Sequence, residues 1–368
     1  MTRRWQWALL PVLALGLSAC STLSHWSQAA AGHLAVVRAA QPVDDWLARA
    51  TTPPELAERL RRAQQMRRFA SAHLALPDNA SYTRYAELGR PAVVWNVVAA
   101  PEFSFTLKTR CYPVMGCAGY QGWFDRAAAQ AQADVLAAEG WEVQVSPVPA
   151  YSTLGWSRWL GGDPLLSTFI RYPEGELAAL IFHELAHQRV YVADDTGFNE
   201  AYASAVEQLG ALAWLADQPA ALAAHERGRA RRAEFQALAR ATRQQLQAIY
   251  DRPEPLEAKR AAKQALLRAV RPPPGYERWF AQANNASFAL LAAYDEWVPA
   301  FLRLFDQQGR DWPRFHAAVE RLAPLTPTQR RAVLAGLSTG TPDEAARAAP
   351  AAGAGGEVGA APSASRLE

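Results

Sequence analysis

The segment Phe182-His183-Glu184-Leu185-Ala186-His187 decides the architecture that this sequence predicts. Residues four positions apart share one face of an α-helix, so His183 and His187 can reach the same metal ion. Glu184 points toward the remaining coordination position, where it can take a proton from a water that the metal holds. The spacing predicts one Zn²⁺ per chain, with Glu184 as the general base of a metal-assisted hydrolysis.

A catalytic zinc takes three protein ligands, and the segment after the motif offers the third. Residues 195–197 (Asp, Thr, Gly) predict a turn, after which a new helix carries Glu200 in its first turn. Two antiparallel helices joined by this turn would bring Glu200 over His187. The rival oxygen donors nearby are Asp194, Asp195 and Glu207. Glu207 lies two turns beyond Glu200 on the same face, so it is better placed to orient a ligand histidine.

The same spacing also occurs by coincidence on helices that bind no metal. Here the motif ends an apolar run over residues 177–182, so both imidazoles are expected to be partly buried. Buried imidazoles need polar partners, and a metal ion supplies one for each. The apolar run therefore favours the metal site. For Glu200 alone, the alternative is a solvated glutamate that the helix dipole favours.

The N-terminus predicts export and lipid attachment. Two arginines precede an apolar run over residues 7–17 that is too short for a stable membrane span, and Leu17-Ser18-Ala19-Cys20 follows. This order is typical of a bacterial lipoprotein signal over residues 1–19, with acylation of Cys20 after cleavage. By analogy with bacterial sorting rules, Ser21 favours sorting to the outer membrane in a Gram-negative host, with the protein facing the periplasm. The alternative is an ordinary cleaved signal peptide in which Cys20 is incidental.

Beyond Cys20 the chain holds two further cysteines, Cys111 and Cys117. An even pair in an exported protein predicts a disulfide. The loop between the two is short, so its closure adds only about 2 kcal/mol, and its main role would be to hold a local turn. A metal site is the alternative, but no histidine or second cysteine pair accompanies these two residues.

The composition indicates a folded protein with a sizeable core. The 368 residues are 50% hydrophobic, and the net charge of +3 is small for this length. The densest basic stretch, residues 227–232, is most simply a solvated helix face, because no aromatic residues interleave with it. We therefore expect no nucleic-acid partner.

The residue pattern predicts an α+β fold that is mainly α-helical. Strands are expected over residues 93–98, 102–108 and 142–148, with a helix over 124–139. Helices dominate elsewhere, including a single helix over 285–305. The expected order is a small mixed or antiparallel sheet, then the pair of zinc-binding helices, then a helical C-terminal part.

The run over residues 182–210, FHELAHQRVYVADDTGFNEAYASAVEQLG, resembles one family in particular, the bacterial aminopeptidases that are predicted to be zinc-dependent lipoproteins. Further stretches that fit this family lie at residues 111–117, 150–156, 163–165 and 284–286, and at Tyr294. The resemblance covers most of the chain between the lipoprotein signal and the C-terminal tail. It implies a zinc peptidase that acts as an aminopeptidase, with a peptide as its substrate.

The pattern Asn199-Glu200-x-x-Ala203 is similar to the third-ligand helix of the gluzincin metallopeptidases, in which a glutamate completes a His-His-Glu site. This likeness implies a gluzincin-like arrangement, with Glu200 as a ligand and Asn199 supporting the ligands from beside them. Two features depart from the broader pattern. Arg189 stands where an apolar residue is more usual, and the interval from His187 to Glu200 is shorter than in thermolysin-like members.

In gluzincins an edge strand binds the substrate backbone, which here points to residues 151–155, with Tyr151 and Gly155 as contacts. An ordinary turn is the alternative. Glu174 is the candidate partner of the substrate amine. The alternative is that the helix dipole alone favours a glutamate at this helix start. The amine-binding segment of the well-known zinc aminopeptidases, Gly-x-Met-Glu-Asn, is absent from the sequence. Tyr294 is the candidate donor to the oxyanion, with a core aromatic as its alternative. Other candidate donors are Tyr191, Asn284 and Asn285.

The resemblance also sets the expected organisation of the chain. The signal peptide over 1–19 is followed by an N-terminal helical segment over 20–90, a zinc metallopeptidase domain over 91–338 and a disordered Ala/Gly/Pro tail over 339–368. Within the domain, the expected parts are the sheet region 91–170, the two metal-binding helices 174–215 and the helical part 216–338.

Together these expectations describe a zinc-dependent aminopeptidase that acylated Cys20 holds on the lipid bilayer of the bacterial cell envelope. The first alternative is a metal-binding but non-hydrolytic scaffold or chaperone lipoprotein. The second is a metal-free structural lipoprotein built from helices. Loss of peptide hydrolysis without loss of zinc, on replacing Glu184 by glutamine, would separate the enzyme from both.

Overall fold

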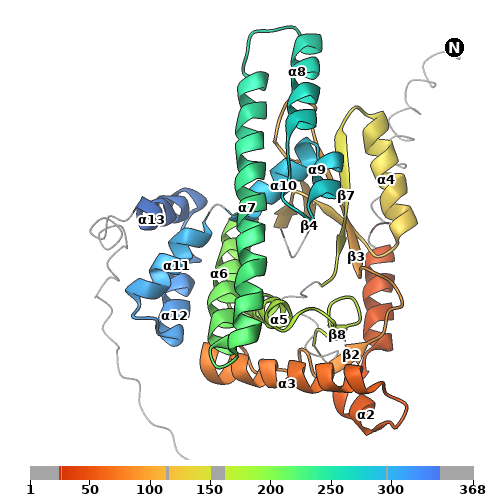
Figure 1. Cartoon of the computed structure of the whole chain (residues 1–368), viewed down its shortest axis with the longest axis vertical. Helices are drawn as coiled ribbons and strands as arrows, with labels where there is room; N and C mark the ends of the chain where they lie inside the picture. Colours follow the sequence, from red (N-terminus) through yellow and green to blue (C-terminus); the bar gives the residue numbers. More distant parts are fainter. Residues whose placement is uncertain (1–24, 26, 113–115, 151–161, 296, 340–368) are drawn as a thin grey trace, which may run out of the picture.

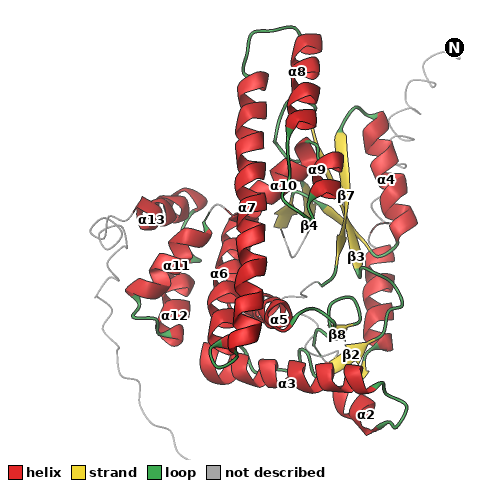
Figure 2. Cartoon of the chain, in the orientation of Figure 1, coloured by secondary structure: helices red, strands yellow, loops and turns green. Residues whose placement is uncertain are grey.

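The structure is a computed structural model, which describes residues 25, 27–112, 116–150, 162–295 and 297–339. Within these residues the chain is mainly helical with three small sheets, in keeping with the expected α+β class (Figure 2). The signal peptide, Cys20 and the tail from residue 340 onward lie outside the described residues. In the described part, no helix has both the length and the apolar character of a membrane span.

Helix α5, Glu174–Arg189, carries the His-Glu-His motif through the centre of the molecule (Figure 1). It begins after Pro173, and acidic residues in its first turn and Arg189 in its last turn suit the helix dipole. Most of its side chains between these ends are buried. Because α5 is buried on nearly all sides, its few polar residues must find partners within the protein.

Helix α6, Thr196–Leu215, packs along α5 after a short turn. Its start is fixed by Asp195, whose side chain accepts a hydrogen bond from the backbone N of Phe198 at 3.1 Å. Farther along, Gly210 permits a close approach, because a Cβ atom there would lie 2.8 Å from both Leu74 and Phe182. The absence of a side chain at this position lets α6 lie directly against α5.

The other helices surround this pair (Figure 1). Helix α3, Pro54–Leu74, packs against both α5 and α6, and the long helix α7, Pro219–Tyr250, contacts both from another side. Residues 27–39 are also helical. The remaining helices are α2 (Val43–Ala48), α4 (Arg126–Ala138), α8 (Leu256–Ala269), α9 (Glu277–Gln282), α10 (Asn285–Asp295), α11 (Val298–Gln307), α12 (Trp312–Leu322) and α13 (Pro327–Thr339).

The single helix expected over 285–305 was wrong, because the structure divides it into α10 and α11. Helix α11 starts at Val298 with Pro299 in its first turn, where a missing N–H costs nothing. Both helices pack on α6, but α10 also packs on strands of the central sheet, whereas α11 also packs on α13.

The central sheet is antiparallel in the order β6-β3-β7, formed by Gln121–Trp123, Val94–Ala100 and Glu142–Val148. Side chains of Trp95, Val97 and Ala99 face α4, while Val98 and Ala100 face α10. Strand β3 is therefore covered on both faces, which explains why its sequence is apolar except at Asn96. The strands expected over 93–98 and 142–148 correspond to β3 and β7.

The strand expected over residues 102–108 was wrong, since this segment is irregular. Its aromatic side chains, Phe103 and Phe105, each lie 5.6 Å from the ring of Tyr250 in α7. Glu102 is bound by the guanidinium of Arg260 in α8 at 2.5 Å. The residues that suggested a strand are thus used to attach the α7–α8 hairpin.

Two smaller sheets complete the fold. One is mixed, with β2 (Arg84–Ala86) between antiparallel β1 (Gln41–Pro42) and parallel β8 (Leu165–Leu166). The other is the hairpin of β4 (Arg110–Tyr112) and β5 (Gly116–Ala118), in which a disulfide joins Cys111 and Cys117.

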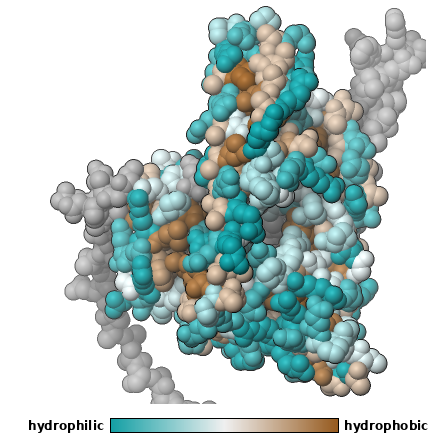
Figure 3. Space-filling model, viewed as in Figure 1, coloured by the Kyte–Doolittle hydropathy of each residue, from teal (hydrophilic) through white to brown (hydrophobic). Residues whose placement is uncertain are grey.

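One large core unites the N-terminal segment with the central and C-terminal helices. It includes buried side chains from α3, α5, α6, α11 and α12, among them Leu60, Met66, Ile181, Phe182, Tyr202, Phe301 and Phe315. The surface in Figure 3 is mainly hydrophilic, with a hydrophobic area over the C-terminal helices. The helices around α5 and α6 are therefore parts of one packing unit.

A buried histidine joins three of these helices. His316 of α12 donates from Nε2 to the carbonyl of Leu74 and accepts at Nδ1 from the hydroxyl of Tyr202, both at 2.8 Å. These roles are those of the neutral imidazole, in which one ring nitrogen donates and the other accepts. Burial lowers the pKa of His316 to about 4, although the Leu74 carbonyl opposes the shift.

We expect the free energy of unfolding to fall as the pH drops from about 6.5 toward 4. In that window the unfolded chain takes up a proton at His316 and the folded chain does not, so the loss reaches about 3 kcal/mol at most. Urea unfolding at pH 7 and pH 5 measures it, with His316→Gln as the comparison. An equal pH dependence in the variant and the wild type would contradict this role.

Candidate metal centre

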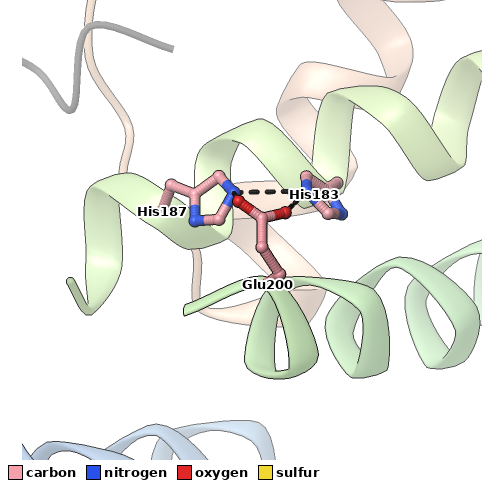
Figure 4. A group of neighbouring side chains, drawn as sticks. All are labelled: His183, His187 and Glu200. Carbon is pink, nitrogen blue, oxygen red and sulfur yellow. Dashed lines mark hydrogen bonds and ion pairs between the residues drawn. The ribbon is translucent and has the colours of Figure 1, made fainter. Parts of the chain in front are cut away.

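The two histidines of α5 and Glu200 of α6 converge on one point (Figure 4). The Nε2 atoms of the two histidines lie 3.2 Å apart. The carboxylate of Glu200 lies 3.4 Å from Nε2 of His183 and 3.7 Å from Nε2 of His187. Tetrahedral zinc with bonds near 2.0–2.1 Å separates its ligand atoms by about 3.3 Å. These three side chains, which the sequence predicts as ligands, can therefore hold one divalent ion.

The turn between α5 and α6 sets the position of Glu200. Asn199 binds both polar groups of Val192, accepting from its N–H at 2.8 Å and donating to its carbonyl at 2.7 Å. Among the described residues, the amide of Asn199 thus holds the backbone of the turn, and its expected role in supporting the ligands stays a prediction. The clamp fixes the chain between His187 and Glu200.

Two aspartates in this turn are committed to other contacts. Asp194, which has a left-handed φ of 64°, accepts a hydrogen bond from the backbone N of Cys117 at 2.6 Å. Asp195 caps α6 and pairs with Arg330 at 2.7 Å. Neither rival donor therefore joins the cluster. The disulfide hairpin, through Cys117, instead holds the turn that joins the two ligand helices.

Carboxylates surround His183. Oε2 of Glu207 lies 3.0 Å from Nδ1 of His183, as expected of a residue that orients a ligand. Because an ionised carboxylate only accepts hydrogen bonds, Nδ1 carries the proton and Nε2 is left for a metal. Burial alone would lower the pKa of His183, but Glu200 and Glu207 outweigh it and raise that pKa well above its usual value.

The second histidine has a different environment. Burial lowers the pKa of His187 to about 4, with Glu200 opposing the shift and His183 adding to it. His187 is therefore neutral near pH 7 and can offer a lone pair. Its Nδ1 atom is buried and has no hydrogen-bond partner among the described residues. Only one of the two ligand histidines is thus supported by a carboxylate.

The predicted general base is buried beside the ligands. Burial raises the pKa of Glu184 to about 7, and although the charge of His183 lowers it, nearby carboxylates add to the rise. Glu184 lies one turn before Gln188, so both face the same side of α5. Gln188 is held there by Asn79 at 2.8 Å and by Asp163 at 3.2 Å.

Sequence reasoning gave no role to Tyr82 and Asp163, which lie on the Glu184 side of the helix. Tyr82 is buried with φ at 64°, a strained value for a bulky residue. Its backbone donates to the Asp163 carbonyl and accepts from Gln64, both at 2.6 Å. Burial raises the pKa of Tyr82, and the charges of Glu184 and Asp163 raise it further. No local pattern signals this group, because its members are far apart in sequence.

Glu174 lies apart from the three candidate ligands, and its expected role as the amine partner stays a prediction. It precedes His183 by nine residues, roughly 13 Å along the helix axis. Its carboxylate binds the guanidinium of Arg62 at 2.5 Å and the indole N–H of Trp214 at 2.9 Å. Glu174 thus joins α3, α5 and α6 at the start of the motif helix.

The remaining predicted residues divide into two groups. Tyr151, Gly155 and Cys20 lie outside the described residues, as does the side chain of Tyr294, whose backbone belongs to α10. Asn284 and Asn285 bind carbonyls of Val143 and Pro101, so their amides hold the sheet. Near the cluster is Tyr191, whose pKa is raised by burial and by the charges of Glu200 and Asp194.

The family described as "Putative aminopeptidase" matches residues 24–334, which is most of the chain. The chain belongs to this family. No curated protein and no solved structure shows significant similarity to it. The family description supports peptidase activity, and the three converging side chains are compatible with a metal-dependent form of it.

We expect metal affinity to decrease as the pH is lowered, because protonated His183 must release a proton before its Nε2 can bind an ion. Below the raised pKa of His183, each unit of pH lowers the apparent affinity about tenfold. Chelator competition with Zn²⁺ from pH 8 to pH 5.5 measures this slope.

The Glu207→Gln variant separates the two effects of this carboxylate. It should lower the pKa of His183, so that proton competition begins at a more acidic pH, and weaken affinity at pH 8 by about 10- to 100-fold. Glu320→Gln, at a half-exposed site in α12, is the control. Coincident curves for Glu207→Gln and the wild type would contradict the orienting role.

Proposed function

We propose that this protein is a zinc-dependent peptidase with aminopeptidase action, in which His183, His187 and Glu200 hold the metal and Glu184 is the general base. The convergence of the three ligand atoms within 4.8 Å of one another carries the proposal. The family description supports the hydrolysis of peptides and the aminopeptidase specificity.

The donor set suits zinc better than the hard cations. Two neutral imidazoles and one carboxylate are common ligands of catalytic zinc, whereas magnesium and calcium prefer oxygen alone. Three protein ligands also leave one position open for the reactants. When bound, zinc would polarise the peptide carbonyl and make the attacking water more acidic.

Glu184 would accept the proton of that water and pass it to the leaving amine. A base works best when its pKa lies near the working pH, and burial brings Glu184 into that range. A cation at the ligands would lower this pKa again, which keeps the carboxylate ionised at neutral pH. Glu207 would keep His183 in the tautomer that offers Nε2 to the metal.

We further propose that the protein is a lipoprotein of the bacterial cell envelope. The signal over residues 1–19 and the cysteine at position 20 support acylation of Cys20 and anchoring in the outer membrane, facing the periplasm. The disulfide between Cys111 and Cys117 suits an oxidising compartment. The enzyme would then meet peptides outside the cytoplasm.

Replacing Glu184 by glutamine tests the enzyme directly. The Glu184→Gln variant should keep about one zinc per chain and its fold, but lose hydrolysis of an unblocked peptide library by 100-fold or more. Elemental mass spectrometry and amine release measure the two quantities, with Glu320→Gln as the matched control. Undiminished turnover would refute Glu184 as the base. Zinc binding by a wild type that cleaves no peptide would favour the non-hydrolytic scaffold.

Anchoring is tested by Cys20→Ala in bacterial cells. The wild type should remain with the membrane fraction after a salt wash and require detergent for release, because two or three acyl chains hold it. The Cys20→Ala variant should not be acylated, so it should not show the detergent-dependent release from the membrane fraction that is expected of the wild type. Mass spectrometry of the mature N-terminus gives the attached groups, and an unmodified Cys20 in the wild type would disprove acylation.

A further inference from the structure

A buried cation lies at the start of the helix that carries Glu200. Arg330 of α13 has 3% of its side chain exposed, and its Nε donates to the carboxylate of Asp195 at 2.7 Å. Its guanidinium also lies 5.3 Å from the ring centre of Phe198 in α6. The charge is thus placed against the first turn of the ligand helix, although Arg330 itself lies 135 positions away in sequence.

Nη1 of Arg330 binds the end of α12 and the turn that follows it. It contacts the carbonyl oxygens of Leu322 at 3.4 Å, of the C-cap residue Ala323 at 2.9 Å and of Leu325 in the turn at 2.8 Å. The last carbonyls of a helix lack partners within the helix, so this contact satisfies groups that would otherwise be unpaired. A planar guanidinium holds its donors in a fixed fork, so it suits several such contacts better than the flexible ammonium of a lysine.

Asp195 connects Arg330 to the start of α6. One carboxylate oxygen accepts from Arg330 and the other accepts from the backbone N of Phe198 at 3.1 Å. The carbonyl of Asp195 also accepts from the backbone N of Asn199 at 3.1 Å, one residue before Glu200. A continuous series of hydrogen bonds therefore leads from the C-terminal helices to the first turn of α6, which carries the third candidate ligand.

We propose that Arg330 is a positioning residue for Glu200, and that helix α13 is therefore part of the support of the metal centre. The proposal rests on the function proposed above. Without the guanidinium, the carboxylate of Asp195 is left with 15% exposure and no cationic partner for its Oδ2. It must then turn toward water or take up a proton, and either change loosens the cap that fixes the first turn of α6.

The test is the zinc affinity of Arg330→Gln, measured by competition with a chromophoric chelator. We expect affinity to fall by about 10- to 100-fold, as for other residues that hold metal ligands in place. Arg189→Gln is the matched control. Arg189 also joins a ligand helix to α12, through Glu320 at 3.0 Å, but both side chains are more than a third exposed. The zinc affinity of Arg189→Gln should equal that of the wild type.

A second comparison separates positioning from a general loss of stability. In a Glu200→Ala background the ligand is missing, so Arg330→Gln should weaken the residual zinc affinity no further. An equal loss in both backgrounds would overturn the proposal, as would a single variant with wild-type affinity. If Arg330→Gln does not fold, Asp195→Asn replaces it, because this side chain keeps the cap but loses the ion pair, and the same outcomes apply.

The result also distinguishes this proposal from the proposed function. A wild type that binds no zinc refutes the metal site itself. A wild type that binds one zinc, together with an Arg330→Gln variant of equal affinity, refutes only the role of Arg330.

Discussion

The packing of α5 against α6 is the contact on which the candidate site depends, because each helix supplies ligands that the other lacks. Gly210 allows this approach, and Phe182, the neighbour of His183, fills the space beside it. Leu74 of helix α3 packs against Gly210 at the same place. Nothing in the local motif holds His183 and Glu200 together, so their separation of 3.4 Å is a product of this packing.

The close packing also creates an electrostatic requirement. Two histidines and three glutamates lie buried or half-buried within one small region, and burial disfavours the charged form of each. The two histidines differ in how they are stabilised. His183 has a carboxylate beside each ring nitrogen, whereas His187 is neutral and its Nδ1 has no hydrogen-bond partner among the described residues. A bound cation would relieve the repulsion between the carboxylates, and for this reason the arrangement suits a metal.

The sequence predicted those parts of the site that follow from local spacing. His183 and His187 share a helix face, and Glu200 and Glu207 follow one short turn later, so helical periodicity places all four. The role expected for Glu174 stays a prediction, because a glutamate at a helix start has several uses, and here its carboxylate binds Arg62 and Trp214. The strand expected over 102–108 was wrong, since packing against Tyr250 overrode the strand propensity of this segment. Tyr82 and Arg330 left no local pattern, and Asp163 was given no role although it lies in a stretch that resembles the family, because only the tertiary fold brings these residues near α5 and α6.

The ion pair between Asp195 and Arg330 also bears on how the protein folds. Its two partners stand 135 positions apart, with the helices from α7 to α12 between them. Helices α5 and α6 can form before α13 packs in place, but until then Asp195 has no buried cation beside it. The start of the ligand helix is therefore completed only when the last described helix is present, and any chain truncated before α13 keeps the whole motif without its final support.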